Sequence, residues 1–292
     1  MNNEVKEVKG IHLISYANLT FRKAQIFQSL RAISLGFNGV MQFSPNDLPM
    51  DFRNKNSETL EMERGAGYWL WKPAIIMNYS QRQDQGINLL YLDSGCLPKK
   101  SSDAYSKLVK DERIHVWTIG NLPLRNWIDL NAVSDLEINK NYGEAPMVWA
   151  GAILARNSKL FENFCELWLR LCENPKYLRP ETLSGYKKPD ELIWHRHDQS
   201  LLSIIVFNHP EWFVVHHDVK GAERWDLFFD RPRKLNPNFK ILYLNLYKFR
   251  KTRQYFIDHA PKRIRIFLRQ WKAKLDKKSL SAEEIQSLKT FY

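Results

Sequence analysis

The stretch RGAGYWLWKPAIIMNYSQRQDQGINLLYLDSG, residues 64–95, contains the two signals around which the chain is organised. The first is a cluster of glycine and aromatic residues that ends at Lys72 and Pro73. The second is the apolar run from Ile87 to Leu92, which stops at Asp93. A buried strand that ends in an acidic residue places a carboxylate at the carboxyl edge of an α/β sheet, where such sheets bind their ligands. We therefore expect Asp93 either to serve a site or to cap a turn.

Apolar runs with strand and helix periodicities alternate on both sides of this stretch. The pattern opens with a strand, a helix and a strand, which predicts a parallel βαβ unit. In the first helix, apolar residues recur at helical spacing and are expected to face the interior: Ala24, Phe27, Leu30 and Ile33. The expected strands are Gly10–Asn18, Gly39–Phe43, Ile87–Leu92, Ile114–Thr118, Met147–Ala155 and Trp212–Val215. The expected helices are Phe21–Leu35, Ser57–Met62, Pro73–Gln81, Ser102–Lys110, Ile128–Leu136, Ser158–Glu173 and one that begins near Asp198. We predict one α/β domain over residues 1–235, with a mixed, mainly parallel sheet flanked by helices, followed by a tail over residues 236–292.

Positive charge is concentrated in that tail. The chain has a formal net charge of +12, and the segment Lys248–Lys278 alone holds twelve Lys and Arg against two Asp. The nearly neutral body argues against a nucleic-acid partner, because such proteins spread basic charge over their binding face. Within Lys262–Leu275 the apolar residues recur at helical spacing, at Ile264, Phe267, Leu268, Trp271 and Leu275. The tail is therefore predicted to form a basic amphipathic helix, which either lies on an anionic membrane surface or docks on the protein's own body.

Cysteine spacing and hydropathy limit the class of protein further. The three cysteines show no zinc-site spacing, which favours reduced thiols in a reducing compartment. The polar start shows no signal peptide, and no apolar run approaches the roughly 18 residues that span a bilayer. We expect a cytoplasmic protein that is soluble or peripheral on the inner face of the cell membrane.

A second dense stretch, Trp194–Ser200, reads WHRHDQS. Asp198 could simply cap the helix that starts there. Alternatively, His195, His197 and Asp198 partly match the HxHxDH run of metal-dependent hydrolases. A further pair, His216 and His217, follows an expected strand, where adjacent side chains point to opposite faces. At most one of them can face a site, and His217 is favoured.

In their order and spacing these motifs resemble the GT-A-fold nucleotide-sugar glycosyltransferases, in particular the branch with bacterial lipopolysaccharide galactosyltransferases and glycogenin. YLDSG, residues 91–95, resembles their Y-L-D-x-D motif, which contains the DxD carboxylates. MVWAGAIL, residues 147–154, is similar to a strand of small residues that lines their sugar pocket. HDQS, residues 197–200, resembles their helix-opening Asp-Gln pair, and VVHHD, residues 214–218, lies where they carry a metal-binding histidine. The combination RGAGYWLWKP plus YLDSG is typical of bacterial surface-polysaccharide transferases.

The resemblance implies an enzyme with a GT-A-like domain that transfers a galactose-like hexose from a UDP-sugar to a lipid-linked, lipopolysaccharide or capsule acceptor. It implies catalytic roles for Asp198 and Gln199 and a Mn²⁺ or Mg²⁺ ion on Asp93 and His217. The expected donor-binding residues are Tyr16, Arg64, Tyr68, Trp71, Lys72, Asp93, Ser94 and Gly95. The expected sugar or acceptor pocket contains Trp149, Gly151 and His197.

One departure from the family pattern bears on the metal. The second Asp of DxD is Gly95 here, and a single carboxylate makes a poorer cation site. Arg64 and Lys72 are candidates to hold the donor diphosphate instead. Two other classes of function stay open: a metal-dependent hydrolase or phosphatase, and a non-catalytic membrane or nucleic-acid adaptor that uses the basic tail.

Overall fold

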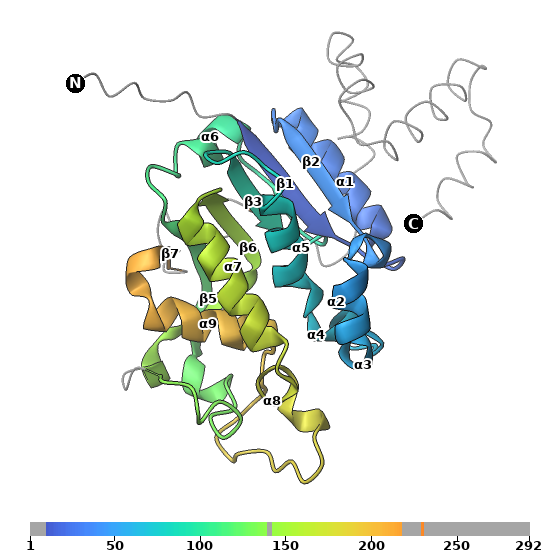
Figure 1. Cartoon of the computed structure of the whole chain (residues 1–292). Helices are drawn as coiled ribbons and strands as arrows, with labels where there is room; N and C mark the ends of the chain where they lie inside the picture. The colour runs from blue at the N-terminus through green and yellow to red at the C-terminus, as the bar shows by residue number, and fades with distance from the viewer. Residues whose placement is uncertain (1–9, 139–141, 218–228, 231–292) are drawn as a thin grey trace, which may run out of the picture.

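The computed structural model describes residues 10–138, 142–217 and 229–230 (Figure 1). The amphipathic helix expected in Lys262–Leu275, and the whole tail over residues 236–292, lie outside the described residues. Within the described ranges, no helix combines the length and the apolar character that crossing a membrane requires.

A six-stranded sheet forms the centre of the protein, in the order β2-β1-β3-β6-β5-β7. Strand β6 runs antiparallel to both β3 and β5, whereas the other three pairings are parallel. The strands are β1 Ile11–Tyr16, β2 Gly39–Phe43, β3 Asn88–Leu92, β5 Ile114–Pro123, β6 Pro146–Arg156 and β7 Phe213–His216. This arrangement confirms the expected mixed, mainly parallel α/β sheet flanked by helices.

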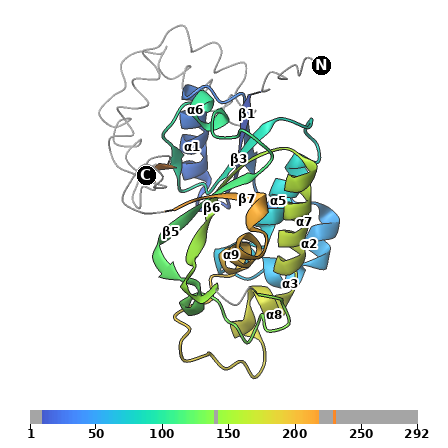
Figure 2. The same ribbon diagram turned by 90° about the vertical axis from the view of Figure 1, so that its left-hand side faces the viewer.

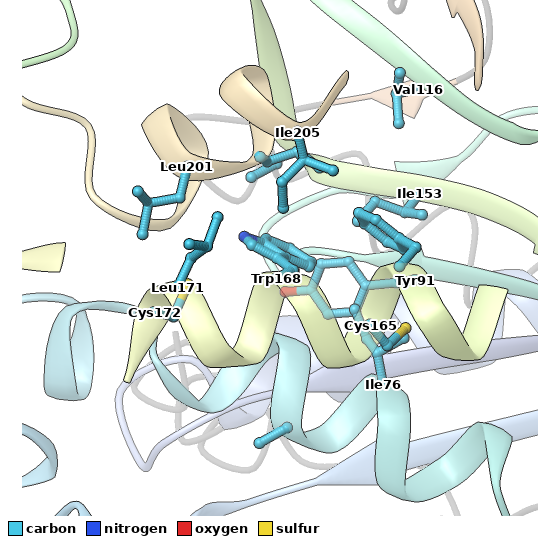
Figure 3. Packing of buried hydrophobic residues seen from close by; sticks show 14 of the residues in the cluster. Ile76, Tyr91, Val116, Ile153, Cys165, Trp168, Leu171, Cys172, Leu201 and Ile205 are labelled. Carbon is cyan, nitrogen blue, oxygen red and sulfur yellow. The ribbon is translucent and has the colours of Figure 1, made fainter. Parts of the chain in front are cut away.

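Helices cover both faces of the sheet (Figures 1 and 2). The larger core lies between the sheet and the helices α5 Trp71–Ser80, α7 Lys159–Cys172 and α9 Asp198–Asn208. Trp168 of α7 and Tyr91 of β3 are both fully buried in this core (Figure 3). The second core lies on the other face, under α1 Arg22–Ser34 and α6 Ser102–Ser106. Strand β3 is buried on both faces, because its residues contribute alternately to the two cores.

Short elements connect these layers and complete the described part of the chain. They are η1 Pro45–Asp47, α2 Met50–Lys55, α3 Ser57–Leu60, α4 Gly65–Tyr68, β4 Leu97–Pro98, η2 Leu124–Asn126, η3 Tyr142–Glu144, α8 Pro175–Leu178, η4 Pro180–Thr182, η5 Pro210–Trp212 and β8 Phe229–Asp230. Strands β4 and β8 pair as a separate two-stranded sheet.

Two expectations from the sequence are wrong. Residues 128–136 form successive turns rather than a helix, because the N–H of Asp129 donates to the distant ring of His195 and its Oδ1 accepts the N–H of Ala132. Such side-chain bonds compete with helical ones. The inward face of α1 also differs from the apolar spacing: Gln25 and Gln28 are fully buried, whereas Phe27 is only half-buried.

Candidate active site

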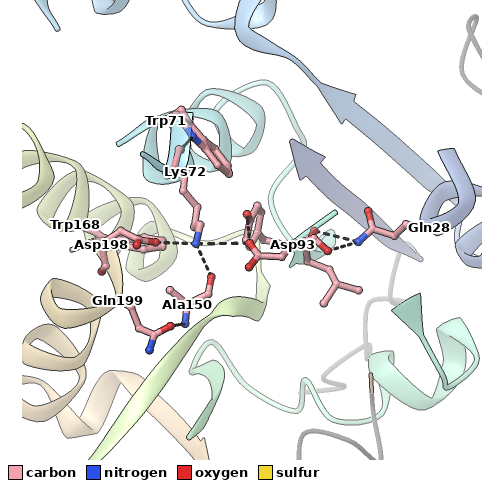
Figure 4. A network of polar contacts seen from close by, with 11 residues as sticks. Gln28, Trp71, Lys72, Asp93, Ala150, Trp168, Asp198 and Gln199 are labelled. Atoms are coloured by element: carbon pink, nitrogen blue, oxygen red, sulfur yellow. Dashed lines mark hydrogen bonds and ion pairs between the residues drawn. The ribbon is translucent and has the colours of Figure 1, made fainter. Parts of the chain in front are cut away.

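Three charged side chains from distant segments meet at the carboxyl end of β3. Lys72 lies in the first turn of α5, Asp93 directly follows β3, and Asp198 is the first residue of α9. The Nζ of Lys72 lies 2.7 Å from Oδ2 of Asp198 and 3.6 Å from Oδ1 of Asp93. It also donates to the carbonyl of Ala150 in β6, at 3.2 Å (Figure 4). We call these three charged residues the charge cluster.

Burial sets the electrostatics of this cluster. The side chains of Lys72 and Asp198 are only 3% and 4% exposed, whereas that of Asp93 is 31% exposed. Burial alone would lower the pKa of Lys72, but the attraction of Asp198 and Asp93 outweighs it, and the pKa lies above its ordinary value. Burial raises the pKa of Asp198 to about 6 against the opposing attraction of Lys72. A carboxylate with a pKa close to neutrality is suited to exchange protons with a bound substrate.

The turn at Asp93 is held from several sides. The hydroxyl of Tyr91 donates to Oδ1 of Asp93 at 2.7 Å, and the backbone N–H of Asp93 donates to the carbonyl of Gly151 at 2.8 Å. Nε2 of Gln28 lies 3.2, 2.8 and 2.9 Å from the carbonyls of Leu92, Asp93 and Cys96. Asp93 therefore belongs both to a structured turn and to the charge cluster, so the two alternatives considered for it are compatible.

Three supporting residues were not anticipated from the sequence. Gln28 clamps the Asp93 turn, Tyr91 orients its carboxylate, and Trp168 donates from Nε1 to the backbone carbonyl of Asp198 at 3.0 Å. A signal for Tyr91 was present, since residues two apart on a strand share a face. The signal for Gln28 was its position three residues after Gln25 in an amphipathic helix, where a buried amide needs partners.

The segment before Lys72 forms an unusual left-handed turn. Five consecutive residues have positive φ: Gly65, Ala66, Gly67, Tyr68 and Trp69, at 59°, 52°, 95°, 52° and 60°. A left-handed conformation costs about 1–2 kcal/mol for each residue other than glycine. Close packing explains the two glycines, because a Cβ on Gly65 would lie 2.5 Å from the Trp69 ring and one on Gly67 would lie 2.7 Å from Cα of Leu60.

His197 fixes this turn against α9. Its Nε2 accepts a hydrogen bond from Nε of Arg64 at 2.9 Å, and its Nδ1 donates to the carbonyl of Leu178 at 2.8 Å. The Tyr68 ring meets the imidazole edge-on at 4.7 Å and the Trp69 ring stacks on it at 5.8 Å. His197 itself has a φ of 55°, so every non-glycine residue with positive φ in the described part of the chain lies at this one place. Backbone strain gathered in this way is typical of functional sites.

The two histidines before Asp198 have no free ring nitrogen. His195 accepts the N–H of Asp129 at Nδ1, 3.1 Å away, and donates from Nε2 to the carbonyl of Tyr177, 2.8 Å away. Burial lowers the pKa of His195 to about 4 and that of His197 to about 3, so both rings are neutral at pH 7. Since Asp198 is paired with Lys72, the geometry offers no support for a hydrolase metal site at these three residues.

The remaining expected donor-site residues lie around the same edge. Tyr16, at the end of β1, stacks on Trp71 with ring centroids 3.8 Å apart, and both rings are buried. Arg64 is exposed and its guanidinium lies 4.6 Å above the ring of Trp194. Ser94 and Gly95 follow Asp93; Ser94 is buried, and the space around a Cβ on Gly95 is open.

Neighbouring residues of strand β6 face different sides of the sheet. The N–H of Ala150 points toward Oε1 of Gln199, at 3.4 Å, on the face that carries the charge cluster. Trp149 packs instead in the second core against Phe229. Its indole lies over Gly151, where a Cβ would approach the ring to 2.3 Å. Gln199 is therefore next to the cluster, whereas the side chain of Trp149 faces away from it.

The two histidines at the end of β7 differ in burial. His216 is the buried member: its Nε2 lies 2.9 Å from Nδ1 of His115, and its ring stacks on Trp117. His217 is exposed. Among the described residues, no group of three His, Cys, Asp or Glu side chains could hold a metal ion.

Comparison with known proteins identifies similar structures but no family. No protein-family model and no curated protein sequence matches the chain. A glycosyltransferase involved in glycosylation of the major capsid of PBCV-1 is 13% identical, with a TM-score of 0.43 over 80% of this chain and 99% of that one. Mouse xyloside xylosyltransferase 1 is 12% identical, with a TM-score of 0.40 over 70% of this chain and 84% of that one. The galactosyltransferase LgtC, in complex with donor and acceptor sugar analogues, is 10% identical, with a TM-score of 0.37 over 71% and 73%. Similarity at this level assigns no activity.

Proposed function

We propose that this protein is a glycosyltransferase that uses a nucleotide-sugar donor. The observation that carries the proposal is the charge cluster: two carboxylates, Asp93 and Asp198, lie on either side of one buried ammonium at the carboxyl end of parallel strand β3. Ligands of α/β sheets bind at that edge. The buried aromatic stack of Tyr16 and Trp71 adjoins it, since Nζ of Lys72 lies 5.9 Å from the centroid of the Trp71 ring.

The roles follow from exposure and charge. Asp93, the most exposed member of the cluster, is placed to accept hydrogen bonds from hydroxyls of the donor. Arg64 is an exposed cation beside the left-handed turn, and its guanidinium fork suits diphosphate oxygens. Lys72, which the sequence also favoured for the diphosphate, is buried, forms ion pairs with Asp198 and Asp93, and donates a hydrogen bond to the Ala150 carbonyl. We therefore assign the diphosphate contact to Arg64.

In the proposed reaction, an acceptor hydroxyl oxygen bonds to the anomeric carbon of the donor sugar. The bond from that carbon to the diphosphate oxygen breaks, and the diphosphate leaves with the electron pair. Asp198 acts at the reacting centre, either by taking the hydroxyl proton or by stabilising positive charge on the sugar ring, in which case the departing diphosphate takes the proton. Gln199 lies one residue further along α9 and orients the sugar by hydrogen bonds.

The divalent cation that the family resemblance implies does not fit the described residues. Oδ1 of Asp93 is engaged by Tyr91, Gly95 stands where a second carboxylate would be needed, and His217 lies exposed beyond β7. A divalent ion on Asp93 would also lie roughly 5 Å from the Lys72 ammonium, where the repulsion is about 7 kcal/mol at an effective dielectric of 20.

The finer parts of the proposal rest on the sequence. A galactose-like hexose, a UDP donor and a lipid-linked, lipopolysaccharide or capsule acceptor follow from the family resemblance. The basic segment Lys248–Lys278 supports contact with anionic lipid and hence work at the inner face of the cell membrane. Co-sedimentation of the full chain with anionic and neutral vesicles tests this contact, and equal binding to both would contradict it.

The variant Asp198→Asn tests the reaction itself. It removes the charge at the proposed reacting centre while keeping the size of the side chain, so we expect sugar transfer to fall at least about a thousandfold. Donor binding, measured as a thermal shift with UDP-sugars, should persist. The matched control is Asp135→Asn, since Asp135 is half-exposed and pairs with Lys176 on the surface. Undiminished transfer by Asp198→Asn would refute the assignment, and the absence of any nucleotide-sugar binding would refute the proposed function.

A further inference from the structure

We infer that the ammonium of Lys72 takes the place of a divalent cation in this site, so that Asp93 and Asp198 act together without a bound metal. The inference concerns a cation site and rests on the geometry of the charge cluster. Only its consequence for catalysis rests on the proposed function.

The arrangement of oxygens around Lys72 is that of a small cation site. Three acceptors from three segments converge on Nζ: Oδ2 of Asp198 at 2.7 Å, the carbonyl of Ala150 at 3.2 Å and Oδ1 of Asp93 at 3.6 Å. Figure 4 shows the ammonium between the two carboxylates, with the Ala150 carbonyl to one side. Carboxylate and carbonyl oxygens are also the ligands that Mg²⁺ and Mn²⁺ prefer. Here, however, the covalently attached ammonium occupies the centre.

The backbone on both sides of Lys72 holds its ammonium in the charge cluster. Lys72 is 2% exposed, and it enters the interior directly after the left-handed turn, where Trp71 anchors the chain by donating from Nε1 to the carbonyl of Gly65 at 3.0 Å. Pro73 follows in the first turn of α5, where its missing N–H costs no hydrogen bond. In this inference, the motif Gly-x-Gly-Tyr-Trp-x-Trp-Lys-Pro serves to position the Lys72 ammonium between the two carboxylates.

The charge balance predicts what happens when the ammonium is removed. Lys72→Ala leaves Asp93 and Asp198 facing each other across a cavity, with the Ala150 carbonyl still pointing into it. Two unneutralised carboxylates in such a place attract a cation strongly. Lys72→Ala is therefore expected to create a divalent-metal site that the natural protein lacks.

Manganese binding to the full-length protein tests this inference without any sugar substrate. Binding is measured from the loss of the free Mn²⁺ signal in electron paramagnetic resonance, with Mn²⁺ also added in thermal denaturation. We expect Lys72→Ala to bind one Mn²⁺ at least about a hundredfold more tightly than the natural protein. Its lowered melting temperature should recover in part on adding Mn²⁺.

Two control variants locate the site. Lys72→Met is also destabilised but fills the cavity, so Mn²⁺ should neither bind nor restore its melting temperature. The double variant Lys72→Ala/Asp93→Asn has lost one carboxylate, and its Mn²⁺ affinity should return to that of the natural protein.

The inference is overturned if the natural protein binds stoichiometric Mn²⁺ in a way that Asp93→Asn abolishes, or if folded Lys72→Ala binds Mn²⁺ no better than the natural protein. If Lys72→Ala fails to fold, the Mn²⁺ titration of the natural protein and of Asp93→Asn decides alone. Calorimetry with UDP-sugars in the presence of a chelator separates this inference from the proposed function. Donor binding lost with chelator but present with Mn²⁺ contradicts the inference, whereas donor binding absent in both conditions contradicts only the proposed function.

Discussion

The ammonium of Lys72 and the carboxylate of Asp198 are 2.7 Å apart in the interior of the protein, with almost no exposed surface on either side chain. A buried ion pair is costly to assemble and still more costly to leave half-made, since the remaining partner becomes an uncompensated charge. The pair joins α5 to α9 across the edge of the sheet. It therefore links the stability of the fold to the geometry of the site.

Double-mutant cycles should show strong coupling across this pair. We expect Lys72→Met and Asp198→Asn each to lower the free energy of unfolding by about 3–5 kcal/mol, and the double variant to lose clearly less than the sum. The control is the pair Lys55–Glu173, which has the same 2.7 Å separation but a Lys side chain that is 66% exposed. Its coupling should stay within about 1 kcal/mol. Equal coupling in the two pairs, measured by urea denaturation, would show that burial is not the deciding factor.

Removing the amide of Gln28 should damage both stability and donor binding. Its Nε2 serves the carbonyls of Leu92, Asp93 and Cys96, and leaving them without a donor costs about 2–3 kcal/mol. We expect Gln28→Ala to weaken donor affinity at least about tenfold, because the Asp93 turn loses its support.

A matched control exists elsewhere in the chain. Nδ2 of Asn157 likewise donates to three carbonyls, those of Ser80, Gln83 and Asp84, at 3.0–3.1 Å. This clamp holds the loop that precedes β3, at the end of that strand remote from Asp93. Asn157→Ala should therefore cost similar stability but leave donor affinity unchanged at temperatures where it is folded. A comparable loss of affinity in both variants would mean that Gln28 acts only through global stability.

Glycine should be tolerated at position 66, in contrast to its usual effect in helices. Ala66 has φ 52° and ψ 51°, which glycine adopts without the penalty that an L side chain incurs. We expect Ala66→Gly to leave the free energy of unfolding unchanged or to raise it by up to about 1 kcal/mol. Ala74→Gly, within the right-handed helix α5, should lower it by about 1 kcal/mol or more. Equal destabilisation of the two variants would argue against the left-handed turn.

The stability of the protein should fall as the pH is lowered from 7 to 5. Burial lowers the pKa of His115 and His195 to about 4 and that of His197 to about 3, and repulsion from His216 adds to the effect on His115. Between these values and about 6.5 the unfolded chain binds protons that the folded protein excludes, so stability rises with pH in that window. At pH 5 each such histidine costs about 2 kcal/mol relative to neutral pH.

Protonation of Asp198 has the opposite effect on stability over part of the same pH range. Its pKa is raised from 3.8 to about 6 by burial, so protonation between these values favours the folded state and offsets one histidine in part. Urea denaturation as a function of pH measures the net effect. Stability that stays level or rises from pH 7 to pH 5 would contradict the neutral, buried state assigned to the histidines.

The sequence by itself determined the layers of this fold. Strand and helix periodicities predicted every strand of the main sheet, α1, α5 and α7, and the start of α9 at Asp198, since burial on one or both faces imposes a regular apolar pattern. The helix expected over residues 128–136 was wrong because its backbone bonds to His195, a partner that lies far away along the chain. Periodicity within a short segment carries no information about a hydrogen-bond partner so far away in the sequence.

The sequence also named Asp93, Lys72 and Asp198 as chemically important residues, but not what they do to one another. Its charge made Lys72 a candidate to bind phosphate, and the family resemblance implied that Asp93 is a metal ligand. Only the tertiary structure brought the two into one buried cluster with Asp198, and in that cluster the ammonium and the carboxylates neutralise each other. The reason is physical: the strength of an ionic contact depends on distance and on exclusion of water, and the packing of α5, β3 and α9 sets both.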